Sequence, residues 1–194
     1  MTKFLKKWTV VGLLILVFGS LSAKTKSEIS RFKIVQNGRT IPVKGNSVLL
    51  NKETFQLVFT LKHEEGILVH ASFNPYTFNK LSSGVLVDDI EALGMGMAAG
   101  LYNPSESLVV EDSAPSYWFY DSEEEHRFDS YMELIDGVEC IRTVSNLENI
   151  EDESLMSVKE VNRPLYLVIV SSVFEVDTNT EVKEVLSYLK IDWR

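Results

Sequence analysis

Apolar and polar side chains alternate strictly over residues 54–62, and this pattern constrains the fold more than any other feature of the chain. One face carries Phe55, Leu57, Phe59 and Leu61, and the other carries Gln56, Val58, Thr60 and Lys62. A period of two is typical of a β-strand that buries one face. Residues 67–73 repeat the pattern after a short turn at 63–66. We therefore expect a hairpin of two antiparallel strands, each giving one apolar face to a sandwich or to a sheet backed by helices.

Two dipeptides predict further hairpins. Asn37-Gly38 tolerates positive φ at both turn positions and separates two short strand-like runs. Asp136-Gly137 predicts a type I′ turn between the strand-like runs on either side of it. Apolar residues in 126–135 also fit helical spacing, and we favour the hairpin because of the turn dipeptide.

Shorter signals predict the remaining elements. Asn74-Pro75 favours the start of a helix over 76–81, because Pro is preferred in the first helical turn. The run 165–174 is apolar on both faces, which indicates a central strand. Apolar residues at helical spacing in 180–189 predict a C-terminal helix; they are Val182, Val185, Leu186 and Leu189. The expected fold class is α+β, a mainly antiparallel β-sheet or sandwich with short helices and a C-terminal helix, in a single globular domain over 31–194.

Residues 1–23 have the three-part layout of a secretory signal peptide. Three lysines precede an apolar run from Trp8 to Phe18, and small residues then continue to Ala23. This run is much shorter than the ~20 residues that a membrane-crossing helix needs. We therefore expect cleavage after Ser22 or Ala23 and a polar lead over 24–30, the alternative being a short uncleaved anchor. The prediction is a protein exported to the periplasm or the cell exterior, which meets the membrane only through this segment.

The charge balance and the cysteine usage narrow the classes of partner. The chain has 19 basic and 28 acidic side chains, a net charge of −9, and loss of the three lysines in 1–23 lowers that charge to −12. We expect no nucleic-acid partner, because binding phosphates takes a basic patch. An acidic surface suits solubility, Ca²⁺ or a basic partner protein. Cys140 is the single cysteine, so no intrachain disulfide is expected and stability comes from packing.

Neither a cofactor nor a metal site is expected from the motifs. The segment from Gly94 to Ala99 satisfies G-x-G-x-x-A, but no convincing parallel strand precedes it. If 54–73 forms a hairpin, His63 and His70 lie about 13 Å apart at ~3.3 Å per residue and cannot share a metal ion. The chain also lacks H-x-x-x-H and C-x-x-C spacings.

Two catalytic arrangements stay open. Cys140, His126 and an acid would form a nucleophile set if the fold brought them together, although a buried structural thiol is the favoured interpretation of this cysteine. Paired carboxylates for glycoside hydrolysis depend on spacing in three dimensions, which the sequence does not show. G-x-S-x-G and H-E-x-x-H motifs do not occur. The sequence therefore identifies no catalytic residues.

An aromatic and acidic segment over 117–127 is the predicted contact site. Its proposed contact residues are Tyr117, Trp118, Tyr120, Glu123, Glu124, His126 and Arg127. On a strand the aromatic side chains point to both faces, so one pair leaves the core unless both faces are covered. Exposed aromatics beside acids would form a platform for sugars or for a basic partner. The competing interpretation is a strand that is buried on both faces.

These observations favour a non-enzymatic binding or interaction module of the cell envelope. Its partner is expected to be an envelope protein or a glycan. One alternative is an exported hydrolase whose site is assembled from distant acids or histidines. Another is an inhibitor-type protein that captures a basic partner through its acidic surface.

Overall fold

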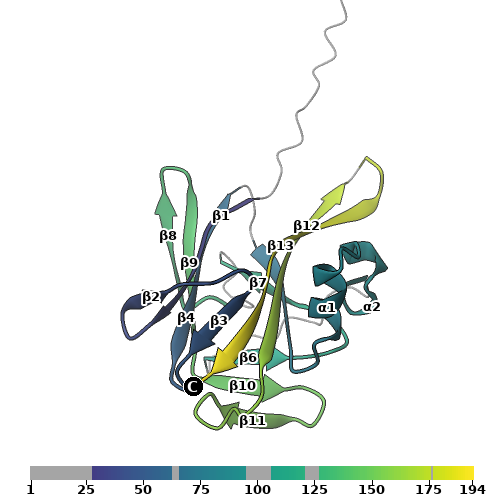
Figure 1. Cartoon of the computed structure of the whole chain (residues 1–194). Coiled ribbons are helices and arrows are strands. Elements are labelled where there is room, and N and C mark those ends of the chain that lie inside the picture. The colour runs from purple at the N-terminus through teal and green to yellow at the C-terminus, as the bar shows by residue number, and fades with distance from the viewer. Residues whose placement is uncertain (1–27, 63–65, 95–105, 121–126, 176) are drawn as a thin grey trace, which may run out of the picture.

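Three β-sheets make up most of the computed structural model, which describes residues 28–62, 66–94, 106–120, 127–175 and 177–194 (Figure 1). Sheet A is antiparallel, in the order β2 (Arg39–Ile41), β1 (Glu28–Gln36), β4 (Phe55–Lys62), β9 (Gly137–Val144) and β8 (Ser130–Leu134). Sheet B has the order β3 (Ser47–Leu50), β13 (Thr180–Trp193), β12 (Leu165–Glu175), β5 (Gly66–Ser72) and β7 (Ser116–Phe119). Sheet C contains β11 (Ser154–Ser157), β10 (Asn146–Asn149) and β6 (Ser107–Val110). Pairing is antiparallel except between β3 and β13 and between β6 and β10.

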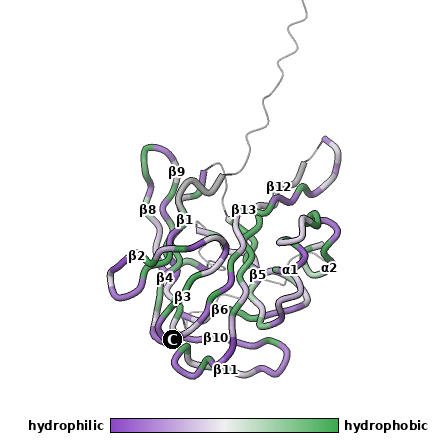
Figure 2. The backbone as a smooth tube through the Cα atoms, viewed as in Figure 1, coloured by the Kyte–Doolittle hydropathy of each residue, from purple (hydrophilic) through white to green (hydrophobic). Residues whose placement is uncertain are grey.

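The main core lies between sheets A and B. Phe59 of β4 is fully buried, and its ring centroid lies 6.4 Å from that of Trp118 on β7 and 6.0 Å from that of Phe128. Apolar side chains from both sheets surround this cluster. Figure 2 shows apolar residues gathered in the middle of the molecule and hydrophilic ones along outer turns such as that between β10 and β11. The face-to-face packing of two sheets explains why the apolar positions of β4 alternate so strictly.

Two short helices and a 3-10 helix cover the other face of sheet B. They are α1 (Tyr76–Ser82), η1 (Val87–Asp89) and α2 (Glu91–Gly94). A second apolar cluster joins them to the sheet, with Leu68 and Val168 packed against Leu81 and Ile90. Sheet B is thus buried on both faces at β5, whose seven residues are all buried. None of the helices that the structure describes is long and apolar enough to cross a membrane.

The hairpin predicted over 54–73 is wrong. Its two strands exist, but β4 pairs with β1 and β9 in sheet A, whereas β5 pairs with β12 and β7 in sheet B. Alternation identifies a strand and its apolar face, and it carries no information on which sheet the strand joins. The chain passes from one layer to the other between Lys62 and Gly66, so the apolar faces of β4 and β5 meet across the core.

The C-terminal helix predicted over 180–189 is also wrong, because this segment belongs to strand β13. The register with β12 shifts where Ile169 pairs with Ser187 and Val170 pairs with Val185, which leaves Leu186 as an extra residue in a β-bulge. Val185 packs towards the helices, whereas Leu186 and Leu189 pack into the main core. The extra residue in the bulge shifts by one which positions of β13 face the main core. The apolar residues before and after the bulge therefore have a spacing similar to that of a helix.

The turn dipeptides were informative to different degrees. Asn37 and Gly38 have φ of 52° and 70° and join β1 to β2 as expected for a type I′ turn. The β8–β9 hairpin is confirmed, but Leu134 pairs with Gly137, so the central turn residues lie one position earlier than expected. Gly137 has φ of 116°, and a Cβ atom there would lie 2.3 Å from the carbonyl oxygen of Leu61. This glycine is required by its backbone conformation and by the closeness of β4.

The architecture is therefore mainly β, with three largely antiparallel sheets and two short helices in the described chain. The β part of the expected fold class is confirmed, and so is the helix that follows Asn74-Pro75. The last element is a strand.

Candidate functional site

Three strands from different parts of the sequence end at one place. The backbone N–H of Glu111, just after β6, donates to the carbonyl oxygen of Ala71 near the end of β5 at 2.7 Å. The N–H of Ile150, just after β10, donates to the carbonyl oxygen of Val110 at 3.1 Å. Because β6 and β10 run parallel, their following residues emerge at the same edge. The loop that precedes β12 closes the site on another side and contributes Arg163.

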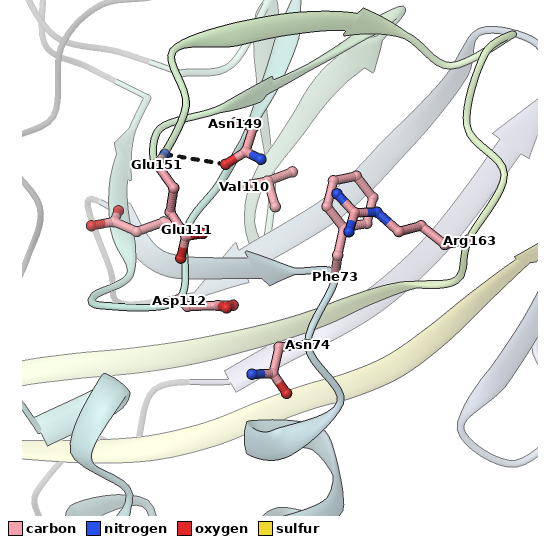
Figure 3. A pocket seen from close by; sticks show the side chains of 8 residues that line it. All are labelled: Phe73, Asn74, Val110, Glu111, Asp112, Asn149, Glu151 and Arg163. Carbon is pink, nitrogen blue, oxygen red and sulfur yellow. Dashed lines mark hydrogen bonds between the residues drawn. The ribbon is translucent and has the colours of Figure 1, made fainter.

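These segments enclose a cavity of about 170 Å³, which we call the acidic pocket (Figure 3). It is lined by Phe73, Asn74, Val110, Glu111, Asp112, Asn149, Glu151 and Arg163. Three carboxylates face one guanidinium in this set, so the lining carries excess negative charge.

Glu111 is the most unusual residue of the pocket, because its charged side chain is only 7% exposed. Its Oε1 accepts a hydrogen bond of 2.6 Å from the hydroxyl of Ser113. Its Oε2 is buried and has no hydrogen-bond partner in the part of the chain that the structure describes. A buried carboxylate oxygen without a partner is costly, and a cation or a donor placed beside it would offset that cost.

A chain of hydrogen bonds holds Asp112 and connects it to α1. The hydroxyl of Ser72 donates to the Asp112 carboxylate. The same hydroxyl oxygen accepts a bond of 2.8 Å from the backbone N–H of Asn74. The Asn74 side-chain oxygen in turn accepts a bond of 3.0 Å from the N–H of Tyr76, at the start of α1. This local Asx turn orders the segment that leaves β5, and so fixes the lower wall of the pocket seen in Figure 3.

Arg163 and Phe73 form a wall of a different chemical kind. The guanidinium carbon of Arg163 lies 3.9 Å from the centroid of the Phe73 ring, a cation–π contact that Figure 3 shows with the guanidinium over the ring. Across the pocket, the side-chain oxygen of Asn149 accepts a bond of 3.1 Å from the backbone N–H of Glu151. The pocket therefore has one side that carries carboxylates and another side where the Phe73 ring is covered by the Arg163 guanidinium.

His70 lies in β5 two residues before Ser72, and it is buried. Burial lowers the pKa of His70 to about 4, although the charge of Asp112 and a hydrogen bond with the Asp112 backbone oppose that shift. Its Nε2 has no hydrogen-bond partner among the described residues, so it does not bond to the Ser72 hydroxyl. Ser72 bonds to Asp112 instead. His70, Ser72 and Asp112 thus stand close together without the serine–histidine hydrogen bond that activates a nucleophile.

The predicted contact segment over 117–127 has a divided outcome. Trp118 is 3% exposed, with its ring 5.6 Å from that of Phe128 in the core, so the expectation of an exposed platform is wrong for this residue. It points inward because β7 pairs with β5, and its face of sheet B packs on sheet A. Tyr117 and Tyr120 are half-buried, and Arg127 is 5% exposed. Glu123, Glu124 and His126 lie outside the described residues.

The other residues singled out from the sequence are not brought into a reactive site. Cys140 is fully buried in the main core, and burial, with the nearby charge of Glu139, raises the pKa of its thiol to about 12. A thiol in that environment stays protonated at neutral pH and is a poor nucleophile. His63 and the glycines at 96 and 100 lie outside the described residues. Within the described ranges, no group of three His, Cys, Asp or Glu side chains is placed to hold a metal ion.

Sequence reasoning missed the acidic pocket. Glu111 and Asp112 directly follow the apolar run 108–110, and Glu151 lies in an acidic run over 151–153, so the side chains themselves are visible in the sequence. Their convergence depends on the parallel pairing of β6 with β10, for which the sequence carries no local signal. Comparison of the chain with protein-family models, with curated proteins and with solved structures finds no match. The chemistry of the pocket is therefore inferred from its own geometry.

Proposed function

We propose that the protein is an exported, non-enzymatic binding module that receives a cationic group of its partner in the acidic pocket. The observation that carries this proposal is the Glu111 carboxylate, which is nine-tenths buried and has an unpartnered Oε2. A buried anion of this kind gains most from a ligand that brings a positive charge. The overall charge of −9 supports the same direction, because it attracts basic partners over a longer range.

The size of the pocket indicates what part of a partner it would hold. Its volume of about 170 Å³ lies below the ~300–1,000 Å³ of cavities that enclose whole small ligands. A single ammonium or guanidinium group fits such a space better than a complete metabolite. We therefore favour the side chain of a lysine or arginine on the surface of a basic protein. Arg163, held over Phe73, would bound the site on its far side.

The groups near the pocket favour binding over catalysis. At neutral pH His70 is uncharged, and its free nitrogen does not reach the Ser72 hydroxyl through a hydrogen bond. Ser72 itself is buried, with 1% of its surface exposed, so a substrate could not reach its hydroxyl directly. General base catalysis requires a base within hydrogen-bond reach of the proton that it removes. This arrangement instead keeps the Asp112 carboxylate in place.

The proposal is tested with two short uncharged-ended peptides that differ only in one residue, lysine in one and norleucine in the other. Titration into the full chain, followed by nuclear magnetic resonance, should shift the backbone signals of Phe73 and Glu111 with the lysine peptide only. Glu111→Gln should weaken binding about tenfold, which corresponds to ~1.4 kcal/mol for the loss of one charge-assisted bond.

Glu133→Gln is the matched control, because it removes one negative charge from the exposed strand β8 and should leave binding unchanged. Raising the salt concentration from ~0.05 to ~0.5 M should also weaken capture of a basic protein steeply. Equal binding of the norleucine peptide, or equal binding by the Glu111→Gln variant, would show that the pocket does not receive a cation. Salt-insensitive capture of a glycan would favour the sugar-binding alternative.

A further inference from the structure

A second cavity lies where the edges of two sheets approach each other. Strand β2 is one of the two outer strands of sheet A, and β3 is one of the two outer strands of sheet B. Between them and the end of β13 is a cavity of about 520 Å³, which we call the edge groove. It shares no lining residue with the acidic pocket.

The walls of the edge groove are largely apolar. Ile41 and Pro42 line it from β2 and the residue after it, and Val48 and Leu49 line it from β3. Leu49 is 48% exposed, whereas Val48 is buried and also belongs to the main core. Neighbouring Val43 is also exposed at 39%. A volume of this size with apolar walls is within the range of cavities that enclose small organic ligands.

Three basic side chains without ion-pair partners among the described residues lie around this groove, although the chain is acidic overall. Lys44 and Arg194 line it, and an adjoining cavity of about 320 Å³ shares Ile41 and Arg194 and adds Arg39. Among the described residues, none of these three cations forms an ion pair, and the Nε of Arg194 donates to the neutral side chain of Asn51 at 2.8 Å. The acid in the lining, Asp192, is paired with Lys190 at 2.9 Å.

We propose that the edge groove binds a single-chain amphiphile with an anionic head group, of the fatty-acid carboxylate type. The apolar walls would bury the chain, and the unpaired cations would receive the carboxylate. The concave shape favours one enclosed chain over docking on a membrane surface, which uses protruding apolar side chains. Charge complementarity selects the sign of the head group, because a cationic amphiphile would meet Arg39, Lys44 and Arg194.

Two probes of equal chain length and opposite charge test this proposal. Decanoate and decyltrimethylammonium are titrated calorimetrically into the full chain, both below the concentrations at which they form micelles. Decanoate should bind at least tenfold more tightly than decyltrimethylammonium. Leu49→Glu places a negative charge on the exposed wall and should weaken decanoate binding at least tenfold.

Leu155→Glu is the matched control, since Leu155 on β11 is 59% exposed and does not line the groove. It should leave decanoate binding unchanged. The double variant Lys44→Gln/Arg194→Gln keeps the apolar walls and should abolish the preference for decanoate. Equal affinity for the two probes, or equal weakening by both leucine variants, would overturn the proposal. Binding to phosphatidylglycerol vesicles without binding to decanoate would overturn it in favour of a membrane-contact surface.

Discussion

Strands β4 and β5 are neighbours in the sequence with the same alternating pattern, and they occupy different environments. One face of β4 is in the main core. Its other face has Val58 and Thr60 buried in the middle of the strand and Gln56 and Lys62 half-buried at its two ends. Both faces of β5 are buried, one against sheet A and the other against the helices. An alternating strand therefore identifies its apolar face, and the fate of its second face depends on what the following chain places over it.

The covered face of sheet B also differs chemically from the outer face of sheet A. Beneath or beside the helices it holds His70, Ser72 and Lys183, all buried. Polar groups in such surroundings need partners, because solvation by water is lost. The Lys183 ammonium donates to the carbonyl oxygen of Leu93 in α2 at 2.7 Å. The helices therefore create an enclosed polar layer, and the acidic pocket lies at the end of β5 where this layer begins.

The largest expected effect comes from removing buried apolar atoms. It tests whether the helix-covered face of β5 contributes as much to the free energy of unfolding as the core face of β4. Leu68→Ala on the helix-covered face should lower the free energy of unfolding by about 2–5 kcal/mol, as much as Leu57→Ala in the main core. Both side chains are fully buried. Urea denaturation of the two variants makes the comparison. A loss below ~1 kcal/mol for Leu68→Ala alone would mean that the helices cover β5 only loosely.

The next effect is the pH dependence that His70 gives to β5. Burial lowers its pKa from 6.5 to about 4, so the unfolded chain binds its proton more readily than the folded chain. The stability that comes from keeping the histidine neutral is fully present above pH 6.5 and is lost as pH falls towards 4. The total loss of unfolding free energy from this residue is about 3 kcal/mol. Between pH 7 and 5 the loss should be about 2 kcal/mol.

His70→Leu should remove this part of the acid destabilisation while keeping an apolar side chain of similar position. Urea unfolding of both proteins at pH 7 and pH 5 measures the difference, because the carboxylates titrate in both. Identical losses of stability in the two proteins would contradict a buried, neutral His70.

The smallest effect compares a buried lysine on the helix-covered face of sheet B with an exposed lysine on sheet A. Lys183→Met should cost about 1–3 kcal/mol, because the Leu93 carbonyl oxygen loses its side-chain donor in a buried place. Lys33→Met on sheet A should cost less than ~1 kcal/mol, since its contact with Glu139 is 3.8 Å long and its side chain is 43% exposed. The thermal unfolding midpoints of the two variants, each compared with the unmodified protein, measure these two losses of stability. A reversed order would show that the helix layer does not depend on Lys183.

Local signals in the sequence identified what depends on neighbouring residues. The Asn37-Gly38 turn, the strands β4 and β5 and the helix after Pro75 follow from backbone preferences and short periods, and all are present. Strand β13 was mistaken for a helix because a bulge at Leu186 broke its period. The sheet to which β5 belongs and the convergence of Glu111 with Glu151 depend on contacts between distant segments. These contacts are decided by the packing of the whole chain, and no window of the sequence contains them.

The long-range closure of sheet B has a consequence for the order of assembly. Strand β13 pairs with both β3 and β12, and Arg194 beside it bonds to Asn51, 143 positions away. Strand β3 has no other partner in sheet B, so it joins that sheet only after β13 has been made. Contacts of such separation form slowly, because a long loop must close before they are gained. Until then the apolar strand β12 offers an open edge to other chains, so dilution or a holding partner should raise the yield of folded protein.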